Sequence, residues 1–375
     1  MNPILDAPFV IDGERQSVTP AQILRGVSAF EPEAWPGAPL PESIPPVVDE
    51  TLETDPAPIA PDPRKVEKYL AGVLRAQRVI PMSFAGQYTR GRIACALIDA
   101  IWKMGRFRIG NLAVDAVWCW NNLAVGNMAG FYRSVEAAGD YLDALGVSLR
   151  ETDFNLSATK CTFEATAGLK PGSDDADLVP GPYSATEPRI GAAGIPGSLQ
   201  PDEASWLVYI PFDSSAYRLG GSLLAQTLEA NPPQAPQIDD APYFIDCYEV
   251  VRELVEDGIV LSGATVGEGG LLPALKGMAT ARTGALLDLS DVRRATGDTR
   301  MVDLLFAEVP GVVIQIRDID FDYIDAELLL QDVAFYPLGH PVMNGGTVRV
   351  KASARTGIQN ILESLVQMQG GEGED

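Results

Sequence analysis

The sequence predicts an α/β fold, and the clearest evidence for this class lies between residues 206 and 316. Three short apolar runs, at 206–210, 259–261 and 312–316, are too short to cross a membrane and indicate buried strands. The segments between these runs carry apolar residues at helical spacing, and glycines stand at several of the joints. Strands that alternate with helices in this way are typical of an α/β layer.

The helices of this half have recognisable faces and ends. The segment after Leu219-Gly220-Gly221-Ser222 predicts a helix with Leu224 and Leu228 on one face. A second helix is expected to begin near Pro242 and to end before Gly258. Residues 263–270 are glycine-rich and predict a turn. The helix expected after this turn has an apolar face made of Leu271, Leu272, Leu275 and Met278.

The first half of the chain predicts the same kinds of element. Asp62-Pro63 is a helix-start signal, so we expect a helix from Arg64 to about Ala76. The elements expected after it are a helix at 91–104, a strand at 113–120, a helix at 129–145 and strands within 147–163. Residues 170–192 are rich in Gly, Pro and Asp and predict a loop. Proline and glycine at 196–202 predict a domain boundary near residue 200.

Residues 1–62 differ from the rest in composition. Proline and acidic residues are dense between Pro36 and Pro63, and such a segment buries too little apolar surface to offset its ordering entropy. We therefore expect an extended arm that is disordered or lies over a partner, with Phe9-Val10-Ile11 apolar enough to dock. The expected organisation is an arm at 1–62, a shortened module at 63–200, a fuller α/β module at 201–365 and an acidic tail at 366–375. A strand at 347–350 and an amphipathic helix at 357–369 are expected near the end.

Charge and cysteine usage limit the class of protein. The chain has 51 acidic and 28 basic residues and a formal net charge of −23. Such a charge repels nucleic acid and anionic membranes, so neither is an expected partner. Cys95, Cys119, Cys161 and Cys247 are far apart in the sequence, and we find no secretory leader. We therefore expect a cytoplasmic protein whose cysteines form no disulfides.

Two glycine-rich segments are the candidate binding elements. Gly220-Gly221-Ser222 stands at a helix start, where backbone N–H groups can be presented to a phosphate. Gly269-Gly270 offers the same geometry before the next helix. At both places the alternative is a tight strand-to-helix turn that needs positive φ, and the local pattern alone favours this alternative.

Glu308 is the candidate metal ligand, because a carboxylate can hold Mg²⁺ together with substrate phosphates. Asp153 and Asp303 are possible helpers. His340 is the only histidine, and its place between Gly and Pro favours a loop residue over a catalytic base. The acidic run at 318–325 lacks the spacing of a calcium loop and favours a solvated helix start.

Trp118 and Trp120 alternate on a predicted strand, with Cys119 between them. The two rings could stack on a purine base. Two tryptophans on one strand more often pack a core or a sheet-to-sheet interface, and we favour that interpretation.

The order of these motifs resembles the aminoimidazole-ribonucleotide-synthetase superfamily, and within it the phosphoribosylformylglycinamidine synthase family. The resemblance covers roughly residues 85–365, from the Trp118-Cys119-Trp120 strand onwards. Its C-terminal part rests on Leu219-Gly220-Gly221-Ser222, on Gly269-Gly270-Leu271 and on Phe306-Ala307-Glu308. The resemblance implies the family fold. With the resemblance taken into account, phosphate binding at Gly220-Gly221-Ser222 and a purely structural turn are equally favoured.

Several charged groups of the family pattern are missing here. The family's Gly-Lys-Asp-Ser-Leu-Ser reads Thr152-Asp153-Phe154-Asn155-Leu156-Ser157. The family's His-Asp-x-Ser-x-Gly-Gly-Leu reads Ala264 to Leu271, with alanine for the histidine and Thr265 for the aspartate. Glycines that shape loops are retained, whereas groups that carry charge or move protons are lost. This pattern predicts a retained fold with a weakened or abolished active site.

The resemblance implies an ATP-dependent C–N ligase of de novo purine biosynthesis, with ATP or ADP and Mg²⁺ as cofactors. Such chemistry needs a metal-bound triphosphate and charges aimed at the transferred phosphoryl group. We expect no glutaminase domain, since no nucleophilic cysteine is followed by the required His and Glu. Two functions remain open. The chain is either a synthase component that needs a homo-oligomeric or hetero-oligomeric partner, or a non-enzymatic nucleotide-binding or assembly protein.

Overall fold

The computed structural model describes residues 3–29, 44–51, 63–70, 79–104, 107–172, 194–297 and 299–351. The chain divides into two compact units, and the division falls inside helix α3 (Ala85–Met104). Unit 1 consists of Met1–Thr54, Arg78–Leu97 and Arg108–Ala185. Unit 2 consists of Asp55–Gln77, Ile98–Phe107 and Thr186–Asp375.

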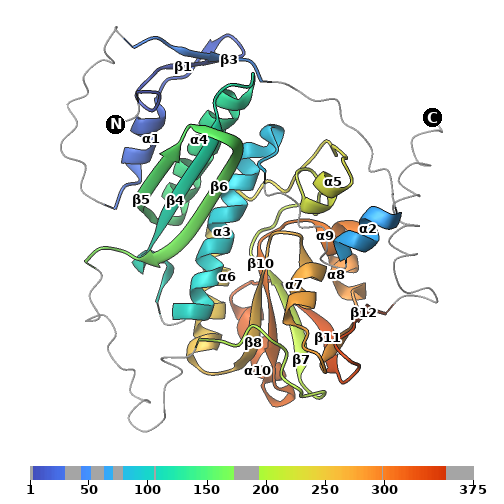
Figure 1. Ribbon diagram of the computed structural model, residues 1–375. Helices are drawn as coiled ribbons and strands as arrows, with labels where there is room; N and C mark the ends of the chain where they lie inside the picture. Colours follow the sequence, from blue (N-terminus) through green and yellow to red (C-terminus); the bar gives the residue numbers. More distant parts are fainter. Residues whose placement is uncertain are drawn as a thin grey trace. The chain divides into compact units, whose positions relative to one another are not determined.

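Unit 1 contains a three-stranded sheet with β4 (Leu112–Asn121) in the centre (Figure 1). Strand β5 (Ser148–Asn155) pairs with β4 in parallel, and β6 (Ser157–Leu169) pairs with it in antiparallel fashion. Helix α4 (Asn127–Leu145) connects β4 to β5, and the short helices η1 (Met82–Phe84) and η2 (Ile109–Asn111) precede α3 and β4. The strands at 113–120 and 147–163 and the helix at 129–145 are thereby confirmed.

The two tryptophans of β4 belong to the core of unit 1. Trp118 is 0% exposed, and its ring stacks on Phe154 with ring centroids 5.1 Å apart. Its Nε1 donates a hydrogen bond of 2.9 Å to the hydroxyl of Ser134 on α4. Trp120, also 0% exposed, donates from Nε1 to the backbone carbonyl of Asn127 over 2.6 Å. Both rings are enclosed by protein, so the packing interpretation holds and stacking on a base does not.

The first 51 residues contain ordered elements where the composition predicted an extended arm. Strands β1 (Phe9–Ile11), β2 (Glu14–Arg15) and β3 (Val47–Asp49) form a small sheet, and helix α1 (Pro20–Gly26) follows β2. Phe9 is 0% exposed and lies against Tyr132 of α4, with ring centroids 5.2 Å apart. The burial of this aromatic ring is what composition alone could not show. The proline-rich residues 30–43 and 52–62 lie outside the described part of the chain.

Asp49 ties this N-terminal segment to α4. Its carboxylate accepts hydrogen bonds from the backbone N–H groups of Gly126, Met128 and Ala129 at 2.5, 2.6 and 3.1 Å. These donors belong to the first turn of α4, which otherwise lacks acceptors for them. A carboxylate at a helix N-terminus also interacts favourably with the helix dipole. Asp49 therefore acts as a cap supplied by a distant part of the chain.

Residues 27–29 run beside β5 and cover part of its edge. Leu149 donates to the carbonyl of Val27 over 2.7 Å, and Ala29 donates to the carbonyl of Leu149 over 2.6 Å. The contact is made within one chain. Strand β6 is the other outer strand of the three-stranded sheet.

Unit 2 is built on a six-stranded sheet with strand order β12-β9-β11-β7-β10-β8. All neighbours are antiparallel except β9 and β12. The unit is therefore an α+β structure with a mixed sheet. The bounds of its strands are β7 Trp206–Pro211, β8 Val260–Val266, β9 Gly284–Leu287, β10 Gly311–Ile316, β11 Tyr336–Val342 and β12 Val348–Val350.

Unit 2 contains the helices α2 Pro63–Leu70, α5 Leu223–Thr227, α6 Ala241–Glu256, α7 Leu271–Met278, α8 Ser290–Ala295, α9 Met301–Phe306 and α10 Phe321–Leu330, with the short η4 at Asp318–Asp320. Four of these helices, namely α2, α5, α6 and α7, lie where the sequence predicted helices. Among the described residues no helix is long and apolar enough to cross a membrane. The helix expected at 357–369 and most of the loop expected at 170–192 lie outside the described residues.

Three boundaries differ from the predictions. Helix α3 begins at Ala85 and not at Gly91, and strand β6 continues to Leu169, beyond the expected end at Phe163. The third is the end of strand β8. Residues 263–266, expected in a glycine-rich turn, complete strand β8, and the turn is confined to 267–270. Gly263 pairs with Ile314 of β10, so sheet pairing fixes its backbone despite the missing side chain.

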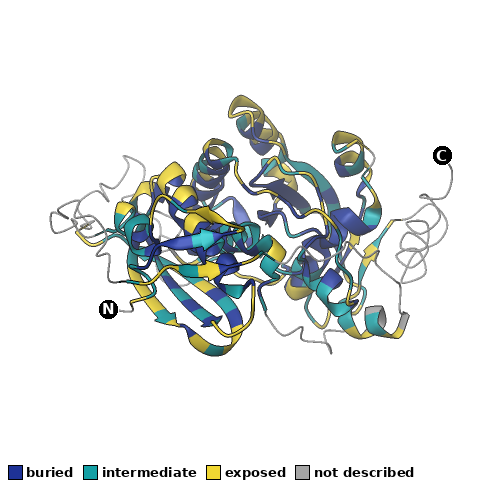
Figure 2. Ribbon diagram, turned by 90° about the horizontal axis from the view of Figure 1, so that it is seen from above, coloured by how far each residue is buried: buried dark blue, intermediate teal, exposed yellow. Residues whose placement is uncertain are grey.

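In the six-stranded sheet the strands β7 and β10 are buried almost throughout, and Figure 2 colours buried residues dark blue. All six residues of β10 are buried, which explains why its sequence is apolar apart from Gln315.

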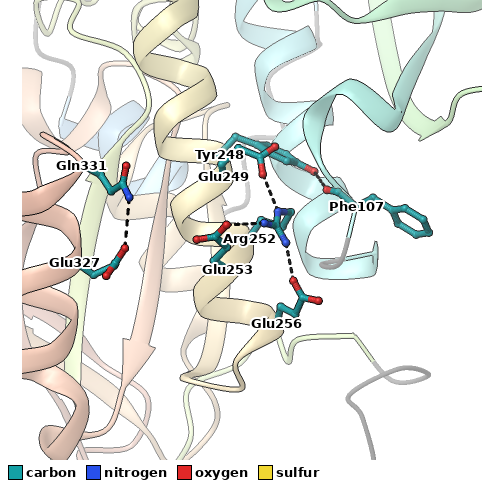
Figure 3. A network of polar contacts seen from close by, with 8 residues as sticks. All are labelled: Phe107, Tyr248, Glu249, Arg252, Glu253, Glu256, Glu327 and Gln331. Carbon is teal, nitrogen blue, oxygen red and sulfur yellow. Dashed lines mark hydrogen bonds and ion pairs between the residues drawn. The ribbon is translucent and has the colours of Figure 1, made fainter. Parts of the chain in front are cut away.

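Arg252 on α6 organises the largest ionic network drawn in Figure 3. Its guanidinium donates to Glu249, Glu253 and Glu256 at 2.9, 2.9 and 2.7 Å. The arginine side chain is 4% exposed, whereas those of Glu253 and Glu256 are about half exposed, at 52% and 54%. On the same helix Tyr248 donates its hydroxyl hydrogen to the carbonyl of Phe107 over 3.2 Å. One buried cation thus holds together three carboxylates that would otherwise repel one another.

We predict that Arg252→Met destabilises the protein by roughly 1–3 kcal/mol, below the full value for a buried ion pair because water screens two of the carboxylates. Urea denaturation followed by circular dichroism measures this change. Arg294→Met is the matched control, because Arg294 is 78% exposed and pairs only with Asp291. An equal effect of the two substitutions would contradict a special role for Arg252.

Candidate functional site

The structure brings the two glycine-rich turns together at the carboxylate of Glu308. We call residues 219–223 the first turn and residues 267–271 the second turn. Oε1 of Glu308 accepts a hydrogen bond of 2.7 Å from the N–H of Leu223 and one of 2.9 Å from the N–H of Gly269. Glu308 follows α9, while the two turns precede α5 and α7. The predicted residues therefore meet in one place, and an internal anion lies between the turns.

The first turn is shaped by close packing of backbone. Gly220 donates to the carbonyl of Gln234 over 2.7 Å, and a Cβ on Gly220 would lie only 2.3 Å from that oxygen. Gly221 follows with φ of 74°. Ser222 then caps α5, since its hydroxyl accepts from the N–H of Ala225 over 3.2 Å. The N–H of Ser222 itself donates to the carbonyl of Leu219.

The second turn is equally constrained. Gly269 and Gly270 both have φ of 85°, a conformation that side chains disfavour. A Cβ on Gly270 would lie 2.7 Å from the Cα of Phe306, so only glycine allows α7 to begin so close to α9. The N–H of Gly270 donates to the carbonyl of Gly267 over 2.8 Å. The structural role of both turns is therefore plain, and phosphate binding by their N–H groups stays a prediction.

Tyr69 of α2 covers the second turn, which the sequence did not indicate. Its hydroxyl lies 3.5 Å from the carbonyl of Gly269, and its ring lies 5.8 Å from that of Phe306. Burial raises the pKa of Tyr69, and the negative charges of Glu308 and Glu268 raise it further. The phenol is therefore neutral at physiological pH and can donate a hydrogen bond.

Glu308 does not fit the role of a magnesium ligand in this arrangement. Its Oε1 already accepts two N–H groups, and amide N–H dipoles repel a cation as strongly as they attract an anion. In the described part of the chain no group of three or more His, Cys, Asp or Glu side chains could hold a metal ion. Asp303, a possible helper, instead pairs with Arg300 through two hydrogen bonds of 2.7 and 3.0 Å. Asp153 lies on β5 in unit 1, where its carboxylate accepts from the N–H of Phe154.

The position of the family's His-Asp pair holds a threonine hydroxyl that links an indole to a carboxylate. The hydroxyl of Thr265 donates to the carboxylate of Asp99 over 2.5 Å and accepts from Nε1 of Trp102 over 2.9 Å. All three residues belong to unit 2. Ala264 beside them has no group that can carry a proton. Asp99 and Trp102 were not singled out from the sequence, because their helix presents no motif that points to β8.

The remaining candidates have structural surroundings. His340, expected in a loop, lies in β11 with its ring 4.0 Å from that of Trp206 and its Nδ1 2.9 Å from the carbonyl of Ser205. The acidic run begins η4 and α10, where Asp318 accepts from Nε1 of Trp206 over 2.8 Å. All four cysteines are described, and no disulfide joins them.

Comparison with known proteins shows a shared fold and a distant sequence relationship. No family model matches the sequence. The structure resembles T. maritima PurL complexed with FGAR, with a TM-score of 0.51 and 15% sequence identity over 74% of this chain and 42% of that one. At this identity the likeness shows the fold alone, a mixed α/β synthetase fold with two modules.

The sequence comparison adds particular relatives. Phosphoribosylformylglycinamidine synthase from Homo sapiens is 26% identical over 232 residues, which are 62% of this chain and 16% of the human protein. A probable chloroplastic or mitochondrial phosphoribosylformylglycinamidine synthase from Arabidopsis thaliana is 29% identical over 151 residues, 40% of this chain and 10% of the plant protein. The chain is therefore a distant relative of the synthase, as the motif order implied, and it spans less than a fifth of these proteins.

We predict that Glu308→Ala lowers the free energy of unfolding by about 2 kcal/mol, because two buried or half-buried N–H groups lose a charged acceptor. Glu308→Gln retains an amide oxygen in the same place and is expected to cost about half as much. Urea denaturation measures both values.

Asp325→Asn is the control for these substitutions, since Asp325 is an exposed carboxylate of α10 in the same unit. It should change the stability by less than about 0.5 kcal/mol. If Glu308→Ala were no more harmful than this control, the two turns would not depend on the carboxylate.

Proposed function

We propose that this chain is a synthase-related component of purine biosynthesis that does not catalyse the ligase step by itself. The observation that supports this proposal best is the Thr265 network. In the related family this place has a histidine and an aspartate, which can carry protons and charge. Here a threonine hydroxyl is held between Trp102 and Asp99, next to an alanine. The fold is kept while the proton-carrying pair is absent.

The glycine turns support the same proposal. Transfer of a phosphoryl group needs a metal-bound triphosphate and positive charge around the transferred group. The two turns offer backbone N–H groups, but those of Gly220, Ser222, Gly269 and Gly270 already donate within the protein. ATP or ADP bound here would have to compete with the carboxylate of Glu308. Any nucleotide binding at this place is therefore weak. Mg²⁺ would bind together with the nucleotide, and Glu308 would not be one of its ligands.

The proposal includes a homo-oligomeric or hetero-oligomeric partner that supplies the charged groups absent from the position of Ala264 and Thr265. It also includes a cytoplasmic location, as expected from the sequence.

We predict that the isolated chain does not convert the formyl-amide ribonucleotide to formylglycinamidine ribonucleotide. The assay contains the ribonucleotide, ATP, Mg²⁺ and ammonium, and it follows ADP release and product formation. The human synthase serves as the positive control under the same conditions. Turnover by this chain above the no-enzyme rate would contradict the proposal. The turnover counts as this chain's own only if the variant Ala264→Val, which places another apolar side chain at the same position, reduces the rate.

A second candidate function is assembly without catalysis, and the outer strand β6 favours it. Strand β6 is 13 residues long and pairs with β4 on one side. Many of its residues are exposed or half-exposed. A long outer strand offers N–H and C=O groups for pairing with another chain. The N-terminal segment covers part of the β5 edge within the chain, so β6 is the edge we propose for a second copy.

We predict that light scattering gives a mass of at least twice 40.1 kDa at micromolar concentration. Hydrogen exchange should slow in β6 as the concentration rises, while the amides of the central strand β4 keep the same rate as an internal control. A monodisperse monomer with fast exchange in β6 at every concentration would refute the shared edge. A large mass without protection in β6 would place the contact elsewhere.

A further inference from the structure

Unit 2 contains a pocket with a volume of about 810 Å³. No residue of the first or second turn lines this pocket, but Arg218, which directly precedes the first turn, does. A volume of this size lies in the range of small-molecule sites. The residues that matter for its chemistry come from four separate segments and are Tyr217, Arg218, Tyr243, Arg300, Asp303 and Tyr336. No motif of the sequence pointed to this combination.

Asp303 and Arg300 form a rigid pair at one side of the pocket. Nε and Nη2 of Arg300 donate to the two carboxylate oxygens of Asp303 over 2.7 and 3.0 Å. The side chain of Asp303 is 6% exposed, while that of Arg300 is 51% exposed. Burial raises the pKa of Asp303, and the charges of Arg300 and Arg218 oppose that rise. The pair fixes the plane of the Arg300 guanidinium and leaves Nη1 outside the pairing.

Arg218 adds a second guanidinium beside the same carboxylate. Its side chain is exposed and lines the pocket together with Arg300 and Asp303. Its charge acts on the carboxylate of Asp303, so the two arginines lie near one buried anion. With Asp213, two positive and two negative side chains line the pocket. The two arginines are the lining groups that an anion can contact.

Asp213, the other carboxylate of the lining, is engaged within its own loop. Asp213 is 3% exposed, and its carboxylate accepts from the N–H groups of Ser215 and Asp240 over 2.8 and 3.1 Å. Burial raises the pKa of Asp213, and the hydrogen bonds from Ser215 and Asp240 oppose that rise. The carboxyl of Asp213 thus holds its own loop, whereas Arg218 and Arg300 line the pocket as donors.

Three tyrosine rings supply apolar wall. The hydroxyl of Tyr217 is bonded to that of Tyr209 over 3.2 Å, and the hydroxyl of Tyr243 accepts from the N–H of Ala334 over 3.0 Å. Because these hydroxyls are held by the protein, the rings contribute mainly their carbon surface. Aromatic rings next to a guanidinium suit a ligand with an apolar or aromatic body and a charged end.

We propose that this pocket binds a small oxyanion, either a carboxylate or a phosphate ester, that carries an aromatic body. Arg218 and the preorganised Arg300 hold the oxyanion, because a guanidinium matches both groups with paired hydrogen bonds. The rings of Tyr217, Tyr243 and Tyr336 pack against the body. The proposal does not depend on synthase activity or on nucleotide binding at the glycine turns.

The test uses the full chain and three probes that share one ring: benzoate, phenyl phosphate and benzyl alcohol. Titration calorimetry measures their affinities at constant ionic strength. We expect benzoate or phenyl phosphate to bind and benzyl alcohol not to bind. The stronger of the two anions identifies the source of the oxyanion as carboxylate or phosphate ester.

Two arginine variants decide where the anion binds. Arg218→Met should weaken the bound anion by about tenfold or more, the factor that corresponds to a lost charge-assisted contact. Arg282→Met removes the same charge from an exposed arginine that does not line the pocket, and it should change the affinity less than about twofold.

Three results would overturn the proposal. One is the absence of binding by both anions at about 5 mM, a concentration at which even very weak sites are seen. Another is an equal loss in the two arginine variants, which would indicate a general charge effect. The third is binding of benzyl alcohol as tight as that of the anions, which would indicate an apolar pocket without recognition of charge.

Discussion

The carboxylate of Glu308 is the contact on which the arrangement of unit 2 depends. By accepting from Leu223 and Gly269, it fixes the starts of two helices that follow different strands. A single anion satisfies donors that helix starts leave without partners, and it replaces an external ligand with a permanent one. The packing of Tyr69 on the second turn and the close approach of Gly270 to α9 both require the turn to stay where Glu308 holds it. The two glycine turns are thereby part of the scaffold of unit 2.

Much of the fold follows from residue spacing. The apolar runs at β7 and β10 and the helical faces of α6 and α7 were visible because each element repeats its own period. The end of β8 was missed because Gly263 is a turn residue by type, while its backbone is set by pairing with β10. The folding of residues 9–29 and 47–49 was missed for a related reason. Phe9-Val10-Ile11 could be recognised as apolar and Asp49 as one of many acids, but only their partners on α4 reveal the roles of Phe9 and Asp49.

The candidate site shows the same limit at the level of side chains. The glycines and Glu308 could be named from the sequence, but their meeting could not, because no periodicity links residues 223, 269 and 308. The chemistry of the meeting was also hidden, since a glutamate serves equally well as a metal ligand or as an acceptor for amides. Arg218, Arg300 and Asp303 carry no motif at all. Long-range contacts of this kind depend on the folded backbone, so they cannot be inferred from the spacing of residues in one sequence.

The cap that Asp49 places on α4 also changes how the first fifty residues should be regarded. Three amides at the start of a 19-residue helix find their acceptor in a residue that is translated some eighty positions earlier. The later segments of unit 1 therefore cannot complete its folding alone. During synthesis Asp49 can cap α4 only after that helix has been made. A shortened protein that starts after Asp49 would leave those amides bare. The low stability of such a shortened protein could then be attributed to the loss of a partner-binding arm, although its cause would be the uncapped helix α4.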